Sequence, residues 1–216
     1  MDQLARKTRP GAGRPTREQA EQRHVELLDR ALEMFLEKGF ELATIEAIAA
    51  SVGMTKRTVY ARYEDKRALF KAAVQRAIER WIVPVETLQA AETEDLEETL
   101  VAIARIRMKN ALSPAGIRLQ RILNAESFRF PEIFALASDQ GTQPTIRFIA
   151  DLLRRRTEKG EVSVEEPEVA ASAFMSMVLS GATRPVVLGA GSIDEASLEI
   201  RLRYCVRLFM NGARPR

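Results

Sequence analysis

The chain contains few of the residues on which secreted proteins and metalloproteins depend. Its 216 residues include one cysteine, Cys205, and one histidine, His24. A single cysteine forms no disulfide within the chain and excludes a zinc site built on cysteines, so we expect a reducing, cytoplasmic compartment. His24 lies among Glu and Arg residues, where we expect an exposed side chain, and no histidine–cysteine cluster is available for a metal. The sequence therefore predicts no metal and no cofactor.

Long apolar runs and aromatic residues are also scarce. No run reaches the ~18 apolar residues of a membrane-spanning helix, and the polar N-terminus lacks the apolar segment of a secretory signal. Aromatic residues make up 6% of the chain, which argues against an all-β sandwich. The sequence shows neither a glycine-rich phosphate loop nor a Ser-His or Cys-His pair with an orienting acid. We therefore predict that the protein is not an enzyme.

Positive charge is concentrated near the N-terminus. Residues 1–17 carry a net charge of +4, and residues 52–71 carry another +4. Because the whole chain is only +3, the remaining residues sum to −5. This asymmetry favours a polyanion that contacts one end of the molecule, although a solvated helix and a disordered tail would also account for it. A helical scaffold, the other class of protein that we considered, would not need such a concentration of charge.

Apolar residues recur at three- and four-residue intervals from residue 17 onward, which predicts an all-α fold with about nine helices. The predicted helices span residues 17–38, 45–51, 55–60, 65–89, 95–112, 114–127, 131–159, 167–188 and 193–210. Gly39 and Gly53 end the first two helices, and Pro84 kinks or breaks the fourth. Gly141 and Pro144 interrupt the seventh. The expected N-caps are Thr44, Thr55 and Asp65.

Residues 45–60 have the pattern of a helix-turn-helix. Gly53 permits a sharp turn between two short helices, and the small Ala49 lets them cross closely. The small core between them consists of Ile48, Val52 and Val59. This leaves polar and basic side chains pointing outward, where they can hydrogen-bond to phosphates and base edges.

The stretch from Phe35 to Phe70 resembles the DNA-binding domain of the TetR family of bacterial-type transcriptional regulators. The matching features are F-x-x-x-G-F, T-x-x-x-I-A, V-G-M-T-x-x-T-V-Y-x-x-Y and K-x-x-L-F, with GRPT in the preceding arm. The resemblance implies a flexible basic arm (1–16), a three-helix DNA-binding domain (17–64) and a helical effector-binding and dimerisation domain (65–216). It implies a sequence-specific regulator, expected to be a repressor released by a small-molecule effector; the sequence leaves activation open.

The resemblance also implies which residues contact a pseudo-palindromic, double-stranded DNA operator. These are Thr44, Thr55, Lys56, Arg57, Thr58, Tyr60, Arg62 and Lys66, with Arg14 and Arg17 of the arm. Tyr60 and Lys66 would contact phosphates, whereas Tyr63 would pack inward. Arg57 and Arg62 depart from the usual family residues and could read guanine, although Arg62 fits a phosphate contact equally well. The arm either reaches the minor groove or remains a disordered tail.

In the family, the last two helices of each subunit form a four-helix bundle in a homodimer. The matching small and apolar positions are Ala170, Ala173, Met177, Gly181, Leu198, Leu202, Cys205 and Phe209. The same spacing fits an ordinary core stripe within one chain.

The middle helices of the family enclose an effector pocket, for which we expect a small hydrophobic or aromatic ligand. The candidate lining residues are Trp81, Met108, Phe128, Phe134, Phe148, Phe174 and Met175, although such residues also form ordinary cores. Arg105, Arg121 and Arg184 could hold an anionic ligand or form surface ion pairs.

Overall fold

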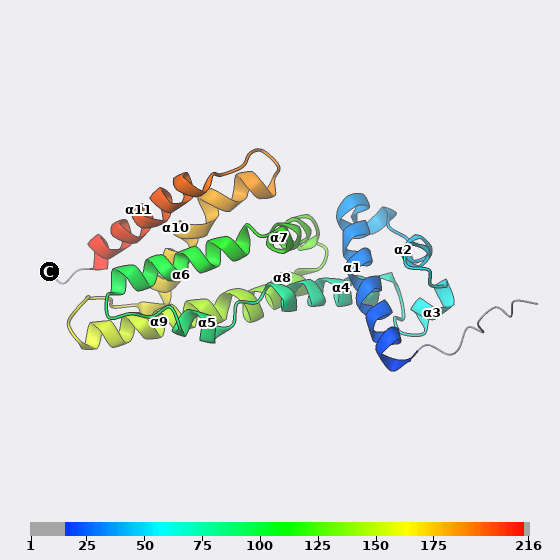
Figure 1. Cartoon of the computed structure of the whole chain (residues 1–216), viewed down its shortest axis with the longest axis horizontal. Helices are drawn as coiled ribbons and strands as arrows, with labels where there is room; N and C mark the ends of the chain where they lie inside the picture. The colour runs from blue at the N-terminus through cyan, green and yellow to red at the C-terminus, as the bar shows by residue number, and fades with distance from the viewer. Residues whose placement is uncertain (1–15, 214–216) are drawn as a thin grey trace, which may run out of the picture.

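Residues 16–213, which a computed structural model describes, fold into helices packed on helices (Figure 1). The elements are α1 (Arg17–Leu42), α2 (Ile45–Ser51), α3 (Lys56–Tyr60), α4 (Lys66–Trp81), α5 (Val85–Gln89), α6 (Leu96–Ala111), α7 (Pro114–Glu126), α8 (Pro131–Ala137), the π-helical η1 (Ser138–Thr142), α9 (Gln143–Glu158), α10 (Pro167–Val187) and α11 (Glu195–Ala213). No strand occurs between residues 16 and 213, and the all-α prediction is confirmed. None of these described helices is long and apolar enough to cross a membrane.

The three predicted N-caps each begin a helix. The hydroxyl of Thr44 accepts the backbone amide three residues onward at 3.2 Å, and that of Thr55 does the same at 3.1 Å. The carboxylate of Asp65 caps α4 at 2.7 Å. Each cap satisfies an amide that has no partner within its helix, so short polar side chains determine where α2, α3 and α4 start.

Glycine and proline divide the helices where the sequence predicts. Gly39 has φ 75° and ψ 165°, so the regular part of α1 ends there and the residues up to Leu42 follow a kink. Pro84 separates α4 from α5, because its ring cannot continue the preceding helix. The predicted helix over 131–159 is divided into α8, η1 and α9, with Gly141 inside the π-helical segment.

Two groups of buried apolar residues stabilise the fold. One lies at the end of the molecule that carries α1, α2 and α3 and extends into α4, α7 and α8; it includes Phe35, Phe70 and Phe130. The ring centroids of Phe35 and Phe70 are 5.0 Å apart, and those of Phe70 and Phe130 are 4.6 Å apart. The second group joins α5, α6, α9, α10 and α11 at the other end (Figure 1). The long helix α4 therefore connects the helix-turn-helix to the rest of the chain.

Replacing Gly53 with alanine should destabilise the protein by about 1–2 kcal/mol, which lowers Tm by roughly 2–8 °C. Gly53 has φ 65°, and an added Cβ would meet no atom within 4 Å, so the cost is backbone strain alone. Thermal unfolding checks this prediction. Gly191→Ala is the matched control, because Gly191 has open space but no positive φ. Equal melting temperatures for the two variants would contradict the strain argument.

Candidate nucleic-acid interface

The α2–turn–α3 unit presents one polar and basic face. Ile48 and Val59 are completely buried between the helices, and Gly53 makes the turn with φ 65°. The predicted DNA-contacting residues that are exposed are Arg17, Thr44, Thr55, Lys56, Arg57, Thr58, Tyr60 and Arg62, whereas Lys66 is half-buried. Arg14 and the rest of the predicted arm before Thr16 lie outside the described residues. The structure thus brings seven of the predicted residues, Thr44 to Arg62, onto one helix-turn-helix.

The hydroxyl groups on this face already have roles in the fold. Thr55 accepts the amide of Thr58, and the two hydroxyl oxygens are 2.8 Å apart. They order the first turn of α3, a helix of only five residues. The hydroxyls therefore present the N-terminus of α3 in a defined orientation, and exposed lone pairs remain for solvent or a ligand.

Two lysines near this face interact with neighbouring groups. Lys56 forms an ion pair with Glu46 and lies 5.4 Å from the centroid of the Tyr60 ring. The hydrogen bond between the Lys56 and Glu46 side chains raises the pKa of Lys56 and lowers that of Glu46. Because both side chains are exposed, the pair contributes little to stability and can be exchanged for a phosphate. Lys66 donates to the backbone carbonyl of Glu41 at 3.0 Å.

Arg57 and Arg62 are the exposed arginines of the helix-turn-helix. Neither forms an ion pair with any residue between 16 and 213. Arg57 lies on α3 and Arg62 follows its end by two residues. Two guanidinium groups without a carboxylate partner beside a short helix can donate bidentate hydrogen bonds to guanine edges or phosphates.

The structure corrects the expectation that His24 is exposed. His24 is half-buried on α1, where its ring stacks on Tyr63 with centroids 5.9 Å apart and an interplanar angle of 13°. Its Nε2 lies 3.3 Å from the Tyr63 hydroxyl. Tyr63 is also half-buried, in agreement with the predicted inward packing. The charged neighbours of His24 in the sequence suggested exposure because they occupy the other faces of α1.

His24 should make the stability of the DNA-binding end depend on pH. Burial lowers its pKa below 6.5; Arg62 and Arg76 act in the same direction, and Glu21 opposes them. The unfolded chain therefore binds the proton more readily, so this stabilisation is complete above about pH 6.5 and decreases as the pH falls below that value. Unfolding of wild type and His24→Gln at about pH 7.5 and 5.5 checks this. The glutamine variant should lose less stability on acidification, and an equal loss in both proteins would contradict the prediction.

The candidate effector residues occupy different environments. Trp81, Met108, Phe148, Phe174 and Met175 are buried within the single-chain core. Phe128 is fully exposed in the turn after α7, and Phe134 is 61% exposed on α8. These two rings therefore do not line an interior pocket, because the turn and the outer face of α8 direct them into solvent.

The three arginines proposed as anion ligands lie near the surface. Arg105 is paired with Glu199, with Nη2 and Oε1 2.7 Å apart. Arg121 donates from Nε to the carbonyl of Val187 at 2.8 Å, and Arg184 is exposed. The interpretation of Arg105 as a surface ion pair is therefore correct.

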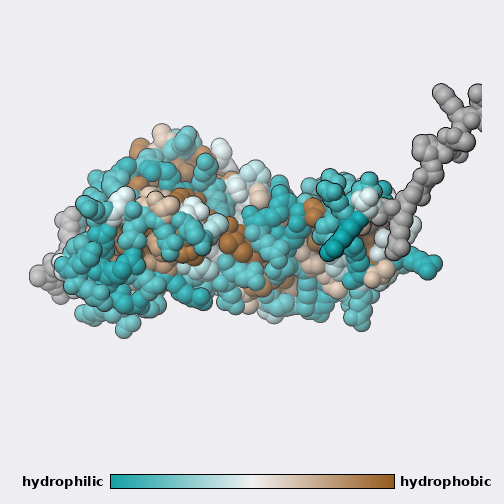
Figure 2. Space-filling view, turned by 60° about the horizontal axis from the view of Figure 1, so that its bottom comes forward, coloured by the Kyte–Doolittle hydropathy of each residue, from teal (hydrophilic) through white to brown (hydrophobic). Residues whose placement is uncertain are grey.

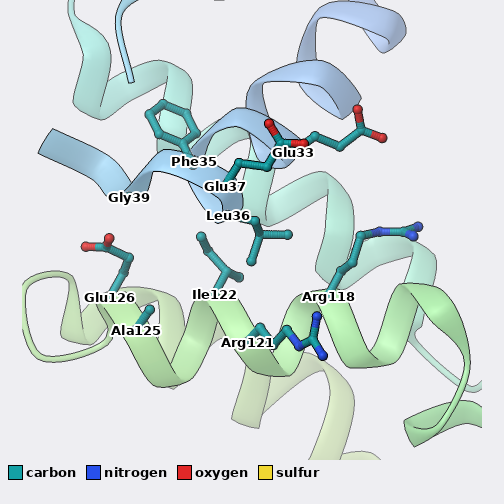
Figure 3. Close-up of a pocket in the computed structure, with 10 residues that line it drawn as sticks. All are labelled: Glu33, Phe35, Leu36, Glu37, Gly39, Arg118, Arg121, Ile122, Ala125 and Glu126. Carbon is teal, nitrogen blue, oxygen red and sulfur yellow. The ribbon is translucent and has the colours of Figure 1, made fainter. Parts of the chain in front are cut away.

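A cleft of about 410 Å³ lies between α1 and α7 (Figure 3). Glu33 and Glu37 lie on its α1 side, and Arg118 and Arg121 lie on its α7 side. Near one end, the Glu126 carboxylate accepts the backbone amide of Phe40 at 3.1 Å. The cleft has walls of mixed charge and lies where α1 packs against α7, so it differs from the apolar pocket that the sequence predicts.

The structure divides the residues predicted for the dimer interface. Leu202 and Cys205 are buried inside the chain, so they cannot also contact a second subunit. Ala173 and Gly181 are exposed, whereas the remaining members are partly buried: Ala170, Met177, Leu198 and Phe209. Part of the predicted stripe is therefore intramolecular core, because α10 and α11 pack on α6 along that face.

The exposed apolar face of α10 and α11 combines predicted residues, such as Ala173 and Met177, with exposed residues that the sequence analysis missed. Ile200, Tyr204 and Leu208 are 71%, 60% and 52% exposed and follow one another at four-residue steps on α11. Val169 on α10 is 65% exposed, and a groove of about 950 Å³ passes beside Val169, Met177 and Leu208. Their spacing was a usable signal, since it marks a second apolar stripe on α11. Figure 2 shows hydrophobic patches between the hydrophilic residues that cover most of one side of the molecule.

Two family profiles match the chain. The family described as "Bacterial regulatory proteins, tetR family" matches residues 27–73, which contain the helix-turn-helix. The family described as "AefR-like transcriptional repressor, C-terminal domain" matches residues 98–212. Together the two matches include the surface around α3 and the exposed apolar face of α10 and α11.

Individual relatives resemble the chain over most of its length. The transcriptional regulator UidR of Escherichia coli K12 is 26% identical over 149 residues, which cover 67% of this chain and 71% of UidR. The flavonoid-responsive regulator FrrA has a similar structure, with a TM-score of 0.71 and 28% identity over 91% of this chain and 99% of that chain. A TetR-family structure from Mesorhizobium loti MAFF303099 superposes with a TM-score of 0.76 at 23% identity and covers 93% of this chain and all of that one.

Proposed function

The chain belongs to the TetR family, and we propose that it is a homodimeric repressor that leaves its operator when a small effector binds. Membership makes it a DNA-binding regulator of transcription, as its relatives are. The match of residues 98–212 to a transcriptional repressor domain supports repression over activation. We place this activity in the cytoplasm, where bacterial DNA is accessible to regulators.

We propose that α3 enters the major groove and that residues 17–64 form the DNA-binding domain. The observation that carries this proposal is the exposed basic face of α3, where Arg57 and nearby Arg62 have no carboxylate partner. Thr44, Thr55, Thr58 and Tyr60 would contact the backbone or base edges beside them. Lys56 can exchange its exposed pair with Glu46 for a phosphate, and Lys66 lies at the start of α4, beside the same unit. Arg14 and Arg17 would extend the contact along the DNA.

We propose that α10 and α11 form the dimer interface within residues 65–216. The exposed apolar face argues for Val169, Ala173, Met177, Ile200, Tyr204 and Leu208 as its centre, in place of the buried Leu202 and Cys205. Gly181 is exposed on α10, but the position of a Cβ there is occupied by the guanidinium of Arg201 on α11, so the close approach at Gly181 is within the chain. Such an apolar face next to an unfilled groove is typical of a surface that a second subunit covers.

We propose that the effector is a small apolar or aromatic molecule and that α4 transmits its binding. α4 begins beside the helix-turn-helix and ends at the buried Trp81, among the helices of the C-terminal part. FrrA is a flavonoid-responsive regulator, and its likeness to this chain over 91% of the sequence supports an aromatic effector. Binding would favour a dimer with the wrong spacing between its two α3 helices, which must lie about 34–36 Å apart to enter successive major grooves.

Selection of bound sites from a random DNA library tests the function. We expect a pseudo-palindromic site whose affinity falls by about 10³–10⁵ between ~50 and ~200 mM salt, if roughly 6–10 phosphates are contacted. Transcription in vitro from a promoter that contains this site should decrease when the protein is added. Binding to no duplex would exclude the proposal, and increased transcription would show an activator instead.

A further inference from the structure

Arg107 is a charged residue inside the protein. It lies on α6 with its side chain 1% exposed, and its Nε and Nη1 atoms are buried without hydrogen-bond partners. Burial lowers the pKa of Arg107 to about 10, so the group remains charged at neutral pH. No ion pair joins it to any residue from 16 to 213. Within the described part of the chain, its one specific interaction is with the ring of Trp81, whose centroid lies 5.0 Å from the guanidinium carbon.

A buried cation without a counterion destabilises a folded protein. Removing a charge from water costs more free energy than a single cation–π contact returns. Such a group is therefore retained for a reason other than stability, and a buried polar atom without a partner often marks a missing ligand. Arg107 has five donor N–H groups in a planar fork that matches a carboxylate or another acidic oxygen group.

The surroundings of Arg107 provide aromatic and polar groups for a ligand. The indole Nε1 of Trp81 is also buried without a hydrogen-bond partner. Gly141 of η1 packs so closely on the Trp81 ring that an added Cβ would lie 2.2 Å from it. Gly141 lies within the π-helical segment, and such segments often mark functional sites. Three elements therefore meet at the Trp81 ring: α4, which carries Trp81 itself, α6, which carries Arg107, and η1, which carries Gly141.

Arg107 also lies where the two cores meet. Trp81 belongs to the buried group at the DNA-binding end, whereas the neighbouring Met108 belongs to the other group. Trp81 is the last residue of α4, and its carbonyl accepts a hydrogen bond from Asn110 of α6 at 2.7 Å. A ligand that displaces the Trp81 ring from Arg107 would therefore shift the end of the helix that leads to the DNA-binding domain.

We propose that Arg107 binds the acidic oxygen atoms of the effector, which is an aromatic or apolar molecule with one ionised group, either a carboxylate or a phenolate. This inference rests on the proposed function, since it names the chemical class of the effector. The acid replaces Trp81 as the partner of the guanidinium, and the indole N–H is a donor for its remaining oxygen. The apolar part of the molecule takes the place of the displaced Trp81 ring, which packs between Arg107 and Gly141 in this structure.

Matched pairs of acidic and neutral probes test the proposal. Cinnamate is compared with cinnamamide, and 7-hydroxyflavone with flavone, by calorimetry on the full chain. At least one acid should bind wild type about tenfold or more tighter than its neutral partner, because charged hydrogen bonds contribute about 1.5–3 kcal/mol. The carboxylate and phenol pairs distinguish the two sources of the acidic oxygen. Trp81 is the only tryptophan, so its fluorescence should change on binding.

Two variants assign the effect to Arg107. Arg107→Met should remove the preference for the acid, whereas Lys109→Met removes an exposed charge from the same helix and should keep it. Arg107→Met should also melt at the wild-type temperature or higher, because a buried unpaired charge is lost. If Arg107→Met does not fold, Arg107→Lys serves instead: it keeps the charge but loses the planar fork, and should weaken the preference.

The outcomes separate this inference from the proposed function. If no acidic probe binds wild type more tightly than its neutral partner, or if Arg107→Met keeps the preference, the inference is overturned. A Tm for Arg107→Met well below that of wild type, with unchanged ligand preference, would likewise assign Arg107 a structural role. The affinity for the operator is measured separately. If an acid binds through Arg107 but leaves the operator affinity unchanged, the acid site is supported and the proposed release from the operator is contradicted.

Discussion

Arg57→Ala should lower the affinity of the dimer for its operator by about 2–6 kcal/mol, or roughly 30-fold or more. A bidentate arginine contributes about 1–3 kcal/mol of discrimination, and a symmetric dimer loses two of them. Arg57 lies exposed on α3 and forms no ion pair with the described residues 16–213, so its removal should leave the fold intact. Fluorescence anisotropy with the selected operator and with variants at each base position measures the loss.

Two comparison variants distinguish base reading from charge. Arg57→Lys keeps the charge but not the fork, so it should retain part of the affinity and lose the preference at one base position. Lys66→Ala should instead weaken binding to all sequences by a similar factor and reduce the salt dependence by about one phosphate per subunit. If Arg57→Ala and Lys66→Ala changed affinity, base preference and salt dependence in the same way, the assigned roles would be wrong.

The double variant Ile200→Asp/Leu208→Asp should convert the proposed dimer into a folded monomer. Both side chains are more than half exposed on α11, so two carboxylates on this face are solvated in the monomer but desolvated in a dimer. A monomer loses the benefit of two linked half-sites, which amounts to about 10²–10⁴ in affinity. Sedimentation equilibrium gives the oligomeric state, and circular dichroism shows whether the helices remain.

Two controls make the dimer experiment specific. Phe134→Asp places a carboxylate on another exposed apolar residue, 61% exposed on α8, and should leave the dimer unchanged. Leu202→Asp places a carboxylate in the core, because Leu202 is 1% exposed, and this variant should unfold the protein. A dimeric double variant, or a monomeric Phe134→Asp, would place the interface on another face.

The sequence by itself determined the helices and the DNA-binding unit. Gly39 and Gly53 need a backbone that glycine adopts readily, and short polar caps such as Thr44 and Thr55 satisfy amides at helix starts. These are local effects that depend on residues within one turn, so they can be predicted without a structure. The exposure of Arg57 was also predicted, because Val59 is the buried residue of the five-residue helix α3 and the other side chains of this helix remain at the surface.

Only the tertiary structure decided which apolar faces are buried within the chain and which remain exposed. A repeat of three and four residues marks an apolar face of α11, but it does not distinguish Leu202, which packs within the chain, from Ile200, which remains exposed. Arg107 illustrates the same limit, because here a charged residue is buried. Arg107 lies on the buried face of α6, although a charged residue in a sequence is ordinarily predicted to be exposed. It is enclosed because α4 packs on α6 and places the Trp81 ring over the guanidinium. Burial depends on contacts between distant segments, so local sequence patterns do not determine it.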